Sequence, residues 1–398
     1  MEDLGRAMAG SHGEMRMLGG GNPAAIPEMQ SLWRERMQEV LAEPGTFDRM
    51  LGNYDPPAGN AAFLDAVASL LRREFGWDLT RENIAVTAGG QTAFFFLFNL
   101  LAGRFGEGRH RKILLPLVPE YIGYANQGLS EEIFRAVEPT IERRVNHEFK
   151  YHIDFDRLQI DSDVGAVCFS RPTNPSGNVL TDEEVRRLDA LARDAGVPLI
   201  IDNAYGTPFP GILFRDATPI WNENIILTLS LSKLGLPGTR TGIVVARPEV
   251  IRSLSSLNAV VGLANSNIGQ VLVRPLLESG EILRLSREVI RPFYERKATQ
   301  AKAWIAESFG ESVEYLVHAN EGALFLWLWF PGMKIPAETL YQRLKARGVL
   351  IVPGHYFGVG APKDWPHGHQ CIRLSFAMDE KSVREGIAII ADEVRTAS

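Results

Sequence analysis

The sequence has few of the features that mark secreted or membrane-bound proteins. Only two cysteines, Cys168 and Cys371, occur in 398 residues. Two cysteines do not make a disulfide framework, so we expect a reducing compartment. The densest apolar stretch, residues 93–102, is too short to span a bilayer. Met1 to Arg6 open with acidic residues and lack the apolar core of a secretory signal. We therefore expect a cytoplasmic protein without a membrane segment.

Positive charge is not in excess either. The chain has 42 Lys and Arg against 48 Asp and Glu, a net charge of −6, and no long basic run. Neither of these features favours a nucleic-acid surface. The dinucleotide fingerprint G-x-G-x-x-G and the P-loop pattern G-x-x-x-x-G-K-[ST] are also absent from the sequence, so those two cofactor classes lose their usual support. The length and the 45% hydrophobic content suit a large α/β domain with a smaller one.

The middle of the chain predicts alternating strands and helices. Residues 164–169 and 197–202 are apolar runs typical of buried strands. Between them, Thr181 and Glu184 form a capping box that begins a helix, and Gly196 ends it. A strand–helix–strand unit at this spacing implies a right-handed crossover and a parallel sheet. The runs 225–229 and 243–246 add two further strands.

The last third of the sequence predicts a smaller α+β unit. Its expected strands cover residues 323–330, 349–352 and 371–377, and its expected helices cover 340–347 and 381–396. We therefore predict three parts of the chain. They are an N-terminal segment 1–45 that packs on the small domain, a large domain 46–285, and a small C-terminal domain 286–398.

A lysine in a polar, glycine-rich turn is the most informative feature. Lys233 follows the hydroxyl residues Ser230 and Ser232, and Arg240 comes seven positions after it. An amine that can form a Schiff base, with hydroxyls and a guanidinium for a phosphate, suits pyridoxal phosphate. Alone, such a lysine is more often an ordinary surface residue. The interpretation therefore depends on other segments.

Two of these segments could hold a phosphate and an aromatic ring. Residues 84–94 predict a strand, a glycine turn and a helix. At the start of that helix, Gly90 and Gln91 would offer free N–H groups and the positive end of the helix dipole to a phosphate. Tyr121 follows the apolar run 113–118 and could stack on a pyridine ring. The ordinary alternatives are a plain glycine turn and a tyrosine at a domain rim.

Two further segments place polar side chains just past predicted strands, where open α/β sheets bind ligands. Asn174 stands between two prolines and could donate to the phenolate oxygen of the cofactor. Asp202 could pair with the protonated ring nitrogen, which keeps the ring an electron sink. Tyr205 would share the phenolate oxygen. An Asn-Pro turn and a helix cap are the alternatives.

The strand predicted at 371–376 contains an arginine. Arg373 could bind a substrate α-carboxylate with its planar fork, or it could form a structural ion pair. Nearby, His367, His369 and Cys371 are metal-ligand types at short spacing. A tetrahedral site needs a fourth ligand, however, and the sequence contains no Cys-x-x-Cys or His-Glu-x-x-His. We therefore predict no metal.

Taken together, these motifs resemble fold-type I pyridoxal-phosphate aminotransferases. The order and spacing of Asn174–Gly177, Asp202–Tyr205, Ser230–Lys233 and Arg240 are similar to those of the family. The resemblance runs from about Leu18 to near the C-terminus. It implies a large domain with a mostly parallel central sheet flanked by helices, plus a smaller α+β domain. It is carried further by five stretches: Leu18–Ala24, Pro119–Tyr124, Ser170–Gly177, Leu229–Gly238 and Phe325–Phe330.

The resemblance also implies roles for individual residues. Lys233, Asp202 and Tyr205 are the expected catalytic residues, with Asn174 beside the phenolate oxygen and Tyr121 stacked on the ring. The residues expected at the phosphate are Gly90, Gln91, Ser230, Ser232 and Arg240. The residues expected at the substrate are Arg373, Asn174 and Gly20. Tyr54 is expected to reach the phosphate of a partner subunit, which implies a homodimer with shared active sites. Ala88 and Gly90 depart from the polar residues that many relatives carry around the first glycine, so a hydroxyl contact to the phosphate is lost.

The resemblance implies an aminotransferase acting on amino acids and 2-oxo acids. The expected reaction moves the amino group of L-valine to pyruvate by a ping-pong mechanism, giving 3-methyl-2-oxobutanoate and L-alanine. One methylene is worth only about 1–3 kcal/mol, so an apolar pocket would also admit other small amino acids. Alternatives on the same scaffold are an aromatic or broad-specificity aminotransferase and a C–S β-lyase. A ligand-sensing regulator would need a DNA-binding module, for which the first 45 or so residues leave no room.

Overall fold

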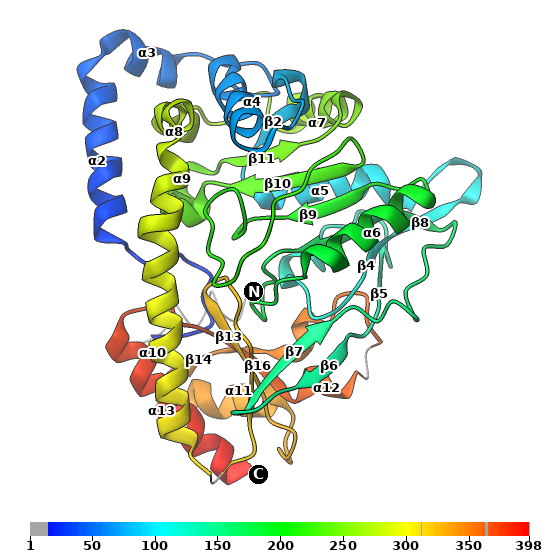
Figure 1. Cartoon of the computed structure of the whole chain (residues 1–398), viewed down its shortest axis with the longest axis vertical. Coiled ribbons are helices and arrows are strands. Elements are labelled where there is room, and N and C mark those ends of the chain that lie inside the picture. Colours follow the sequence, from blue (N-terminus) through cyan, green and yellow to red (C-terminus); the bar gives the residue numbers. More distant parts are fainter. Residues whose placement is uncertain (1–14, 312, 363–364, 398) are drawn as a thin grey trace.

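The computed structural model describes residues 15–311, 313–362 and 365–397. The molecule has two lobes, one above the other in Figure 1, and each is built on a sheet. The long helix α10 (Arg291–Phe309) runs along one side from the upper lobe into the lower one. It follows α8 (Ile268–Ser279), α9 (Glu281–Leu285) and a π-helical turn (Ser286–Ile290).

The upper sheet has the strand order β2-β11-β10-β9-β8-β4-β3, with β5 paired to β4. Its strands are β2 (Ile84–Thr87), β3 (Gly103–Arg104), β4 (His110–Leu115), β5 (Phe134–Ala136), β8 (Val164–Ser170), β9 (Leu199–Asp202), β10 (Ile225–Ser230) and β11 (Gly242–Val245). The four neighbouring pairs among β5, β4, β8, β9 and β10 are parallel, whereas β11 runs antiparallel to both of its neighbours. The predicted strands are present, and the sheet is mostly parallel, with antiparallel pairing at β11 and at the edge strand β3.

Helices cover both faces of this sheet. They are α4 (Ala61–Phe75), α5 (Gly90–Leu101), α6 (Asp182–Asp194) and α7 (Pro248–Val261). Successive residues of β8 therefore point to opposite faces of the sheet. Val167 belongs to the apolar cluster on one face, and Cys168 belongs to the cluster on the other. The predicted capping box starts α6, since Thr181 Oγ1 accepts from Glu184 N at 3.1 Å and Glu184 Oε2 accepts from Thr181 N at 2.8 Å.

The lower sheet has the order β15-β16-β13-β12-β7-β6. Its strands are β6 (Thr140–Arg143), β7 (Glu148–His152), β12 (Leu316–His318), β13 (Phe325–Trp329), β15 (Val352–Pro353) and β16 (Cys371–Ser375). It packs with α10, α11 (Ala337–Ala346) and α13 (Glu380–Ala397). The hairpin β6–β7 comes from the range predicted for the large domain, yet β7 pairs with β12. Chain order therefore does not separate the two sheets, and the division at residues 45 and 285 stays a prediction.

The N-terminal segment contacts both lobes. β1 (Arg16–Met17) pairs with β14 (Val349–Leu350), and Leu18 lies so close to α13 that a Cβ on Gly386 would come within 2.5 Å of its Cδ1. In contrast, α2 (Pro27–Ala42) lies against the upper lobe, where Trp33 Nε1 donates to the Leu234 carbonyl at 2.9 Å. α3 (Pro44–Gly52) follows it. Residues 1–14 of the predicted N-terminal segment lie outside the described residues.

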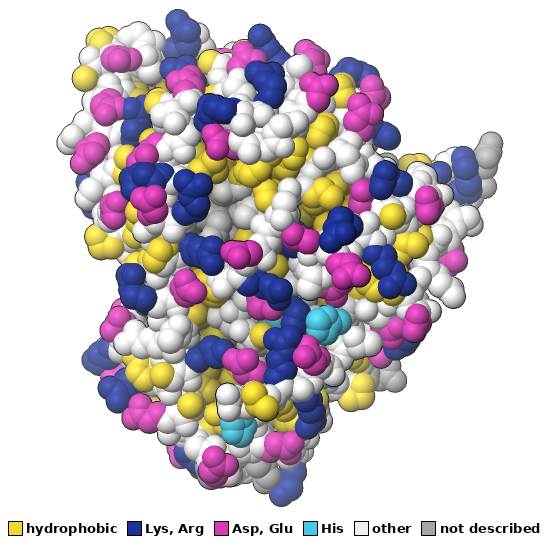
Figure 2. All heavy atoms as spheres, viewed as in Figure 1, with side chains coloured by type: hydrophobic (Ala, Val, Ile, Leu, Met, Phe, Trp, Pro, Cys, Tyr) yellow, Lys and Arg dark blue, Asp and Glu magenta, His cyan; other side chains and the backbone are white. Residues whose placement is uncertain are grey.

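Within the described ranges, no helix has the length and apolar character needed to cross a membrane. Figure 2 shows basic and acidic side chains interspersed over the face in view. Both cysteines are free thiols in the buried core.

Candidate active site

The candidate site lies at the carboxyl edge of the upper sheet. β2 and β10 are both antiparallel to β11, and β8 and β9 are parallel to β10, so all four strands end at this edge. The segments that follow β2, β8, β9 and β10 carry most of the predicted residues. Ligands bind at this edge in open α/β sheets because loops and helix N-termini converge there.

Lys233 lies in the short helix η4 (Ser232–Leu234) after β10. Its Nζ donates to the Gly21 carbonyl at 2.6 Å and lies 5.1 Å from the centre of the Tyr205 ring. Burial of the amine, together with the positive charges of Arg373 and Arg240, lowers the pKa of Lys233 to about 8. The neutral fraction near physiological pH is therefore far larger than that of an ordinary lysine, and the neutral amine is the form that acts as a nucleophile or a general base.

Asp202 ends β9 and is buried. Its Oδ2 accepts from the Tyr124 hydroxyl at 2.8 Å, and its Oδ1 accepts from Ala204 N at 2.9 Å and from Thr228 Oγ1 at 3.4 Å. Burial raises the pKa of Asp202, against the effect of these hydrogen bonds. The described residues thus give this carboxylate only neutral hydrogen-bond donors. A cationic group of a bound ligand would complete its surroundings.

Arg373 lies on β16 with its guanidinium buried beside Asn174. Its Nη1 donates to Asn174 Oδ1 and its Nη2 to the Gly19 carbonyl, both at 2.7 Å. The guanidinium carbon lies 4.1 Å from the centre of the Phe325 ring and 5.1 Å from that of Phe357. Its Nε has no hydrogen-bond partner among the described residues, and burial lowers the pKa of Arg373 to about 10. The structural ion pair considered from the sequence is not among the ion pairs of the described side chains, so the charge is open to a ligand carboxylate.

The segment around Gly20 passes beside both cations. The carbonyls of its neighbours, Gly19 and Gly21, accept from Arg373 and Lys233 respectively. The backbone of this segment, rather than any side chain, therefore lies next to the predicted substrate position.

An anion cradle is formed at the start of α5. Gly89 has φ +87°, and a Cβ there would lie 2.1 Å from Nη2 of Arg240, so only glycine lets the guanidinium pack against this turn. The hydroxyls of Ser230 and Ser232 lie 3.1 Å apart. The first N–H groups of a helix have no intrahelical partner. The N-terminus of α5, the guanidinium of Arg240 and the two serine hydroxyls are together suited to binding a phosphate.

Tyr121 and Gln91 contact each other on the other side of this turn. The Tyr121 hydroxyl donates to Gln91 Oε1 at 3.3 Å, and Gln91 Nε2 donates to the Gly123 carbonyl at 2.9 Å. A Cβ on Gly123 would lie 2.3 Å from the Tyr121 ring. The side chain of Gln91 thus holds the Tyr121 loop, which leaves its backbone N–H as the group available to a phosphate.

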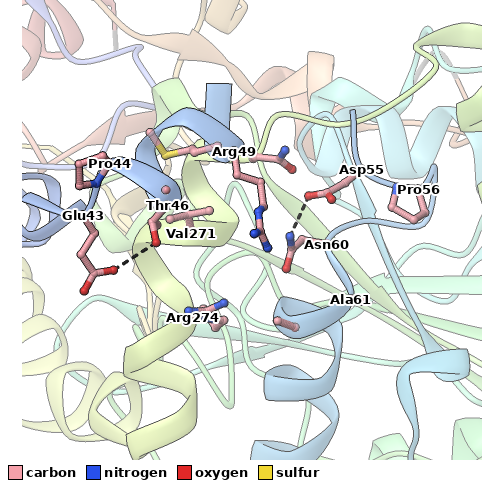
Figure 3. A pocket seen from close by; sticks show the side chains of 14 residues that line it. Glu43, Pro44, Thr46, Arg49, Asp55, Pro56, Asn60, Ala61, Val271 and Arg274 are labelled. Atoms are coloured by element: carbon pink, nitrogen blue, oxygen red, sulfur yellow. Dashed lines mark hydrogen bonds between the residues drawn. The ribbon is translucent and has the colours of Figure 1, made fainter. Parts of the chain in front are cut away.

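Tyr54 is the predicted residue that is not brought into the site of its own chain. Its side chain is 82% exposed and has no hydrogen bond or ring contact among the described residues. The next two residues, Asp55 and Pro56, line a cavity of about 720 Å³ between α3, the start of α4 and α8, where the Asn60 amide donates to Asp55 Oδ2 at 2.8 Å (Figure 3). None of the predicted site residues lines this cavity.

The histidines weighed as metal ligands lie in a short helix, α12 (Pro366–His369), and not at a strand start. His367 Nε2 contacts the Tyr151 hydroxyl, and the ring of His369 stacks on His355 with centroids 5.0 Å apart. Burial lowers the pKa of His367 to about 4. In the part of the chain that the structure describes, no three His, Cys, Asp or Glu side chains are grouped to hold a metal.

Two residues at the site were missed from the sequence. Tyr124 binds Asp202, and Glu120 is buried behind Tyr121, with hydrogen bonds to Ser170 and to the Tyr121 N–H. The only signal was local: Glu120 precedes the predicted stacking tyrosine, and Tyr124 follows it by about one helical turn.

Comparison with known proteins places the chain in a family. Residues 29–390 match the family described as aminotransferase class I and II. The chain is 49% identical to the valine–pyruvate aminotransferase of Escherichia coli K12 over 96% of this chain and 91% of that protein. The crystal structure of the valine–pyruvate aminotransferase of Salmonella typhimurium matches with TM-score 0.92 and 48% identity, covering 100% of this chain and 98% of that one. A kynurenine aminotransferase from Pyrococcus horikoshii shares the fold, with TM-score 0.81 and 20% identity over 99% and 93% of the two chains.

The chain therefore belongs to the aminotransferase class I and II family, and it is a transaminase. The predicted family and fold class are confirmed.

The residues present also fit the cofactor expected from the sequence. The anion cradle matches the phosphate of this cofactor. Asp202, a buried carboxylate with only neutral donors, matches its ring nitrogen. Lys233, an amine of lowered pKa, matches its aldehyde.

Proposed function

We propose that this transaminase moves the amino group of L-valine to pyruvate, giving 3-methyl-2-oxobutanoate and L-alanine. Near-half identity to the valine–pyruvate aminotransferase of E. coli over most of both chains supports the substrate assignment. The structural observation that carries it is Arg373, a buried arginine without a carboxylate partner among the described residues, close enough to Lys233 to lower its pKa. An α-amino or 2-oxo acid brings the missing carboxylate.

Pyridoxal 5′-phosphate is the cofactor, and when bound it supplies a cationic ring that withdraws electrons from the α-carbon of the amino acid. We assign its attachment to Lys233 and its ring nitrogen to Asp202, with Tyr121 against the ring. Asn174 and Tyr205 would donate to its phenolate oxygen. The phosphate would be held by the backbone of Gly90 and Gln91 with Ser230, Ser232 and Arg240.

Lys233 moves the proton in this proposal. When Nζ is not attached to the cofactor, its lowered pKa would give it a far larger neutral fraction than an ordinary lysine has. The neutral Nζ would accept the proton from the α-carbon of valine and would hold it for return at the adjacent carbon of the bound cofactor. A positioned acid–base group of this kind contributes roughly 10²–10⁴-fold to the rate.

Arg373 and Asn174 orient the substrate. The two nitrogens of Arg373 that now bond to Asn174 and the Gly19 carbonyl form a planar fork that matches a carboxylate. Its place between Phe325 and Phe357 restricts the direction of that fork.

We further propose that the enzyme is a homodimer in which Tyr54 reaches the partner's phosphate. Nine large hydrophobic side chains are exposed among the described residues, and six come from two neighbouring regions. These six are Leu41, Leu51, Tyr54, Val260, Val261 and Leu263. The second region adjoins the loop that carries Tyr54, since Asn258 in α7 and Asn265 just beyond it both donate to the carbonyl of Pro57. Exposed apolar side chains near Tyr54 support this proposal, because a monomer gains nothing from leaving them in water.

The function is tested by a half-reaction. Purified holoenzyme is mixed with single L-amino acids in the absence of any oxo acid, and the cofactor absorption is followed. Valine and alanine should change the resting spectrum, and pyruvate should restore it. Conversion only by aromatic or acidic amino acids would refute the substrate assignment. Release of ammonia without an oxo-acid acceptor would instead indicate a β-lyase.

A further inference from the structure

A second buried carboxyl group lies behind the site, and the roles assigned above do not use it. Glu120 has no exposed surface. Its Oε1 accepts from Ser170 N at 2.8 Å, and its Oε2 accepts from Ser170 Oγ at 2.6 Å and from Tyr121 N at 3.1 Å. All three donors are neutral.

These donors belong to two segments that carry residues assigned to the cofactor. Tyr121 is the residue assigned to the ring face. Ser170 ends β8 and is the register partner of Asp202 on β9, and the next residue, Arg171, donates its N–H to the Asp202 carbonyl at 2.9 Å. One carboxyl group therefore joins the stacking residue to the strand end beside the ring-nitrogen residue. Ser170 also begins the loop that carries Asn174.

The backbone of Glu120 reaches the substrate side as well. Its N–H donates to the Phe357 carbonyl at 2.9 Å, and the Phe357 ring faces the guanidinium of Arg373. Glu120 thus lies where Tyr121, the Asn174 loop and the carboxylate-binding arginine meet.

Stability alone gives little reason for an acid at this position. Burial raises the pKa of Glu120 to about 8, and the charge of Asp202 adds to this, whereas the hydrogen bonds from Ser170 and Tyr121 oppose it. A buried carboxyl group without a cation costs free energy whether it stays charged or takes up a proton. The two oxygens of Glu120 accept hydrogen bonds from Ser170 and from Tyr121, and an apolar side chain could not accept them.

We propose that Glu120 is a positioning residue for transamination, which holds Tyr121 and the Ser170–Asn174 loop in register with Asp202. The inference rests on the proposed function, because the residues that Glu120 holds are those assigned to cofactor and substrate.

The test is Glu120→Gln in the holoenzyme. Glutamine keeps the shape of the side chain but has only one accepting oxygen. Its amide nitrogen cannot accept, so either the bond from Ser170 N or the bond from Tyr121 N is lost. We expect cofactor release to be faster and kcat with valine and pyruvate to fall, each by roughly tenfold, as happens when residues behind metal ligands are removed. The KM for valine should change much less, because Arg373 is untouched. The resting absorption band of the cofactor should shift.

Two further variants keep the test decisive. Asp189→Asn removes another buried carboxylate, which lies in α6 and accepts from Asn222 Nδ2 at 3.0 Å, far in the fold from these contacts. It should leave the spectrum, cofactor release and kcat unchanged. Ser170→Ala removes only the hydroxyl donor and should shift all three readouts in the same direction as Glu120→Gln, but less.

The results for these variants distinguish a structural role of Glu120 from a positioning role. If Glu120→Gln lowers only the unfolding temperature and matches Asp189→Asn in every other readout, Glu120 is structural and the proposal is wrong. If Glu120→Gln does not fold, Ser170→Ala decides by the same readouts. Wild-type enzyme that fails to exchange amino groups between valine and pyruvate would overturn the proposed function instead.

Discussion

Replacing Arg373 by lysine separates the shape of the carboxylate-binding group from its charge. Arg373→Lys keeps a positive charge at the inner end of the site but removes the planar fork. The native fork makes two hydrogen bonds of 2.7 Å, one from each terminal nitrogen, to Asn174 and to the Gly19 carbonyl. A substrate carboxylate is expected to take bonds from this same fork.

The magnitude follows from the number of bonds lost. A lysine has one nitrogen, so it retains one of the two directed bonds to the carboxylate. A hydrogen bond to a charged group contributes about 1.5–3 kcal/mol, and 1.4 kcal/mol corresponds to tenfold in affinity. Valine should therefore bind roughly 10- to 150-fold more weakly. Loss of the guanidinium stacked near Phe325 adds to this effect.

The half-reaction measures this directly. Holoenzyme is titrated with L-valine without pyruvate, and the rate of the spectral change is plotted against valine concentration. The half-saturating concentration should rise by the factor above, and the limiting rate should change by less than about tenfold, since uniform binding is what is lost. Arg347→Lys is the matched control, because Arg347 is a surface arginine paired with Asp392 and Glu393. A rise below about threefold in Arg373→Lys would contradict the reasoning.

Three further predictions concern the cofactor. Asp202→Ala should keep the cofactor attached to Lys233 but lose about 100-fold or more in turnover, because the ring charge is no longer stabilised; a wild-type rate would refute the role of Asp202. Lys233→Ala should fold without the lysine-linked absorption band, and undiminished transamination would overturn the assignment. Attachment of cofactor to apoenzyme should become faster as pH rises, with a midpoint near 8, because the pKa of Lys233 is lowered to about 8 and only the neutral amine reacts; a midpoint near the ordinary lysine value would contradict this.

Much of the site could be predicted because its residues lie in short segments directly after strands. Lys233, Asp202 and Asn174 each follow an apolar run whose end is visible in the sequence. Parallel strands bring their carboxyl ends to one edge, so chain order alone predicts that these side chains meet. The helix α6 was predictable for the same local reason, since Thr181 and Glu184 cap it within four residues of chain.

What could not be predicted depends on contacts between distant segments. The hydrogen bond from Ser170 to Glu120 spans 50 positions and that from Tyr124 to Asp202 spans 78. The hairpin β6–β7 has ordinary strand residues, but its neighbour β12 lies more than 150 residues later, so its place in the lower sheet is decided by packing. Tyr54 could be named only from the resemblance, because its expected contact is to a second chain.

The charged residues of the site also affect one another's protonation. Burial is the largest cause of the lowered pKa of Lys233, and the positive charges of Arg373 and Arg240 lower it further before any anion arrives. The same two arginines that would hold carboxylate and phosphate therefore increase the neutral fraction of the lysine. Losing the charge of Arg373 should then have a consequence that losing its shape does not. Arg373→Gln should move the midpoint of cofactor attachment to higher pH, whereas Arg373→Lys should leave it close to that of the wild type. Equal midpoints in all three proteins would mean that burial alone sets the pKa of Lys233.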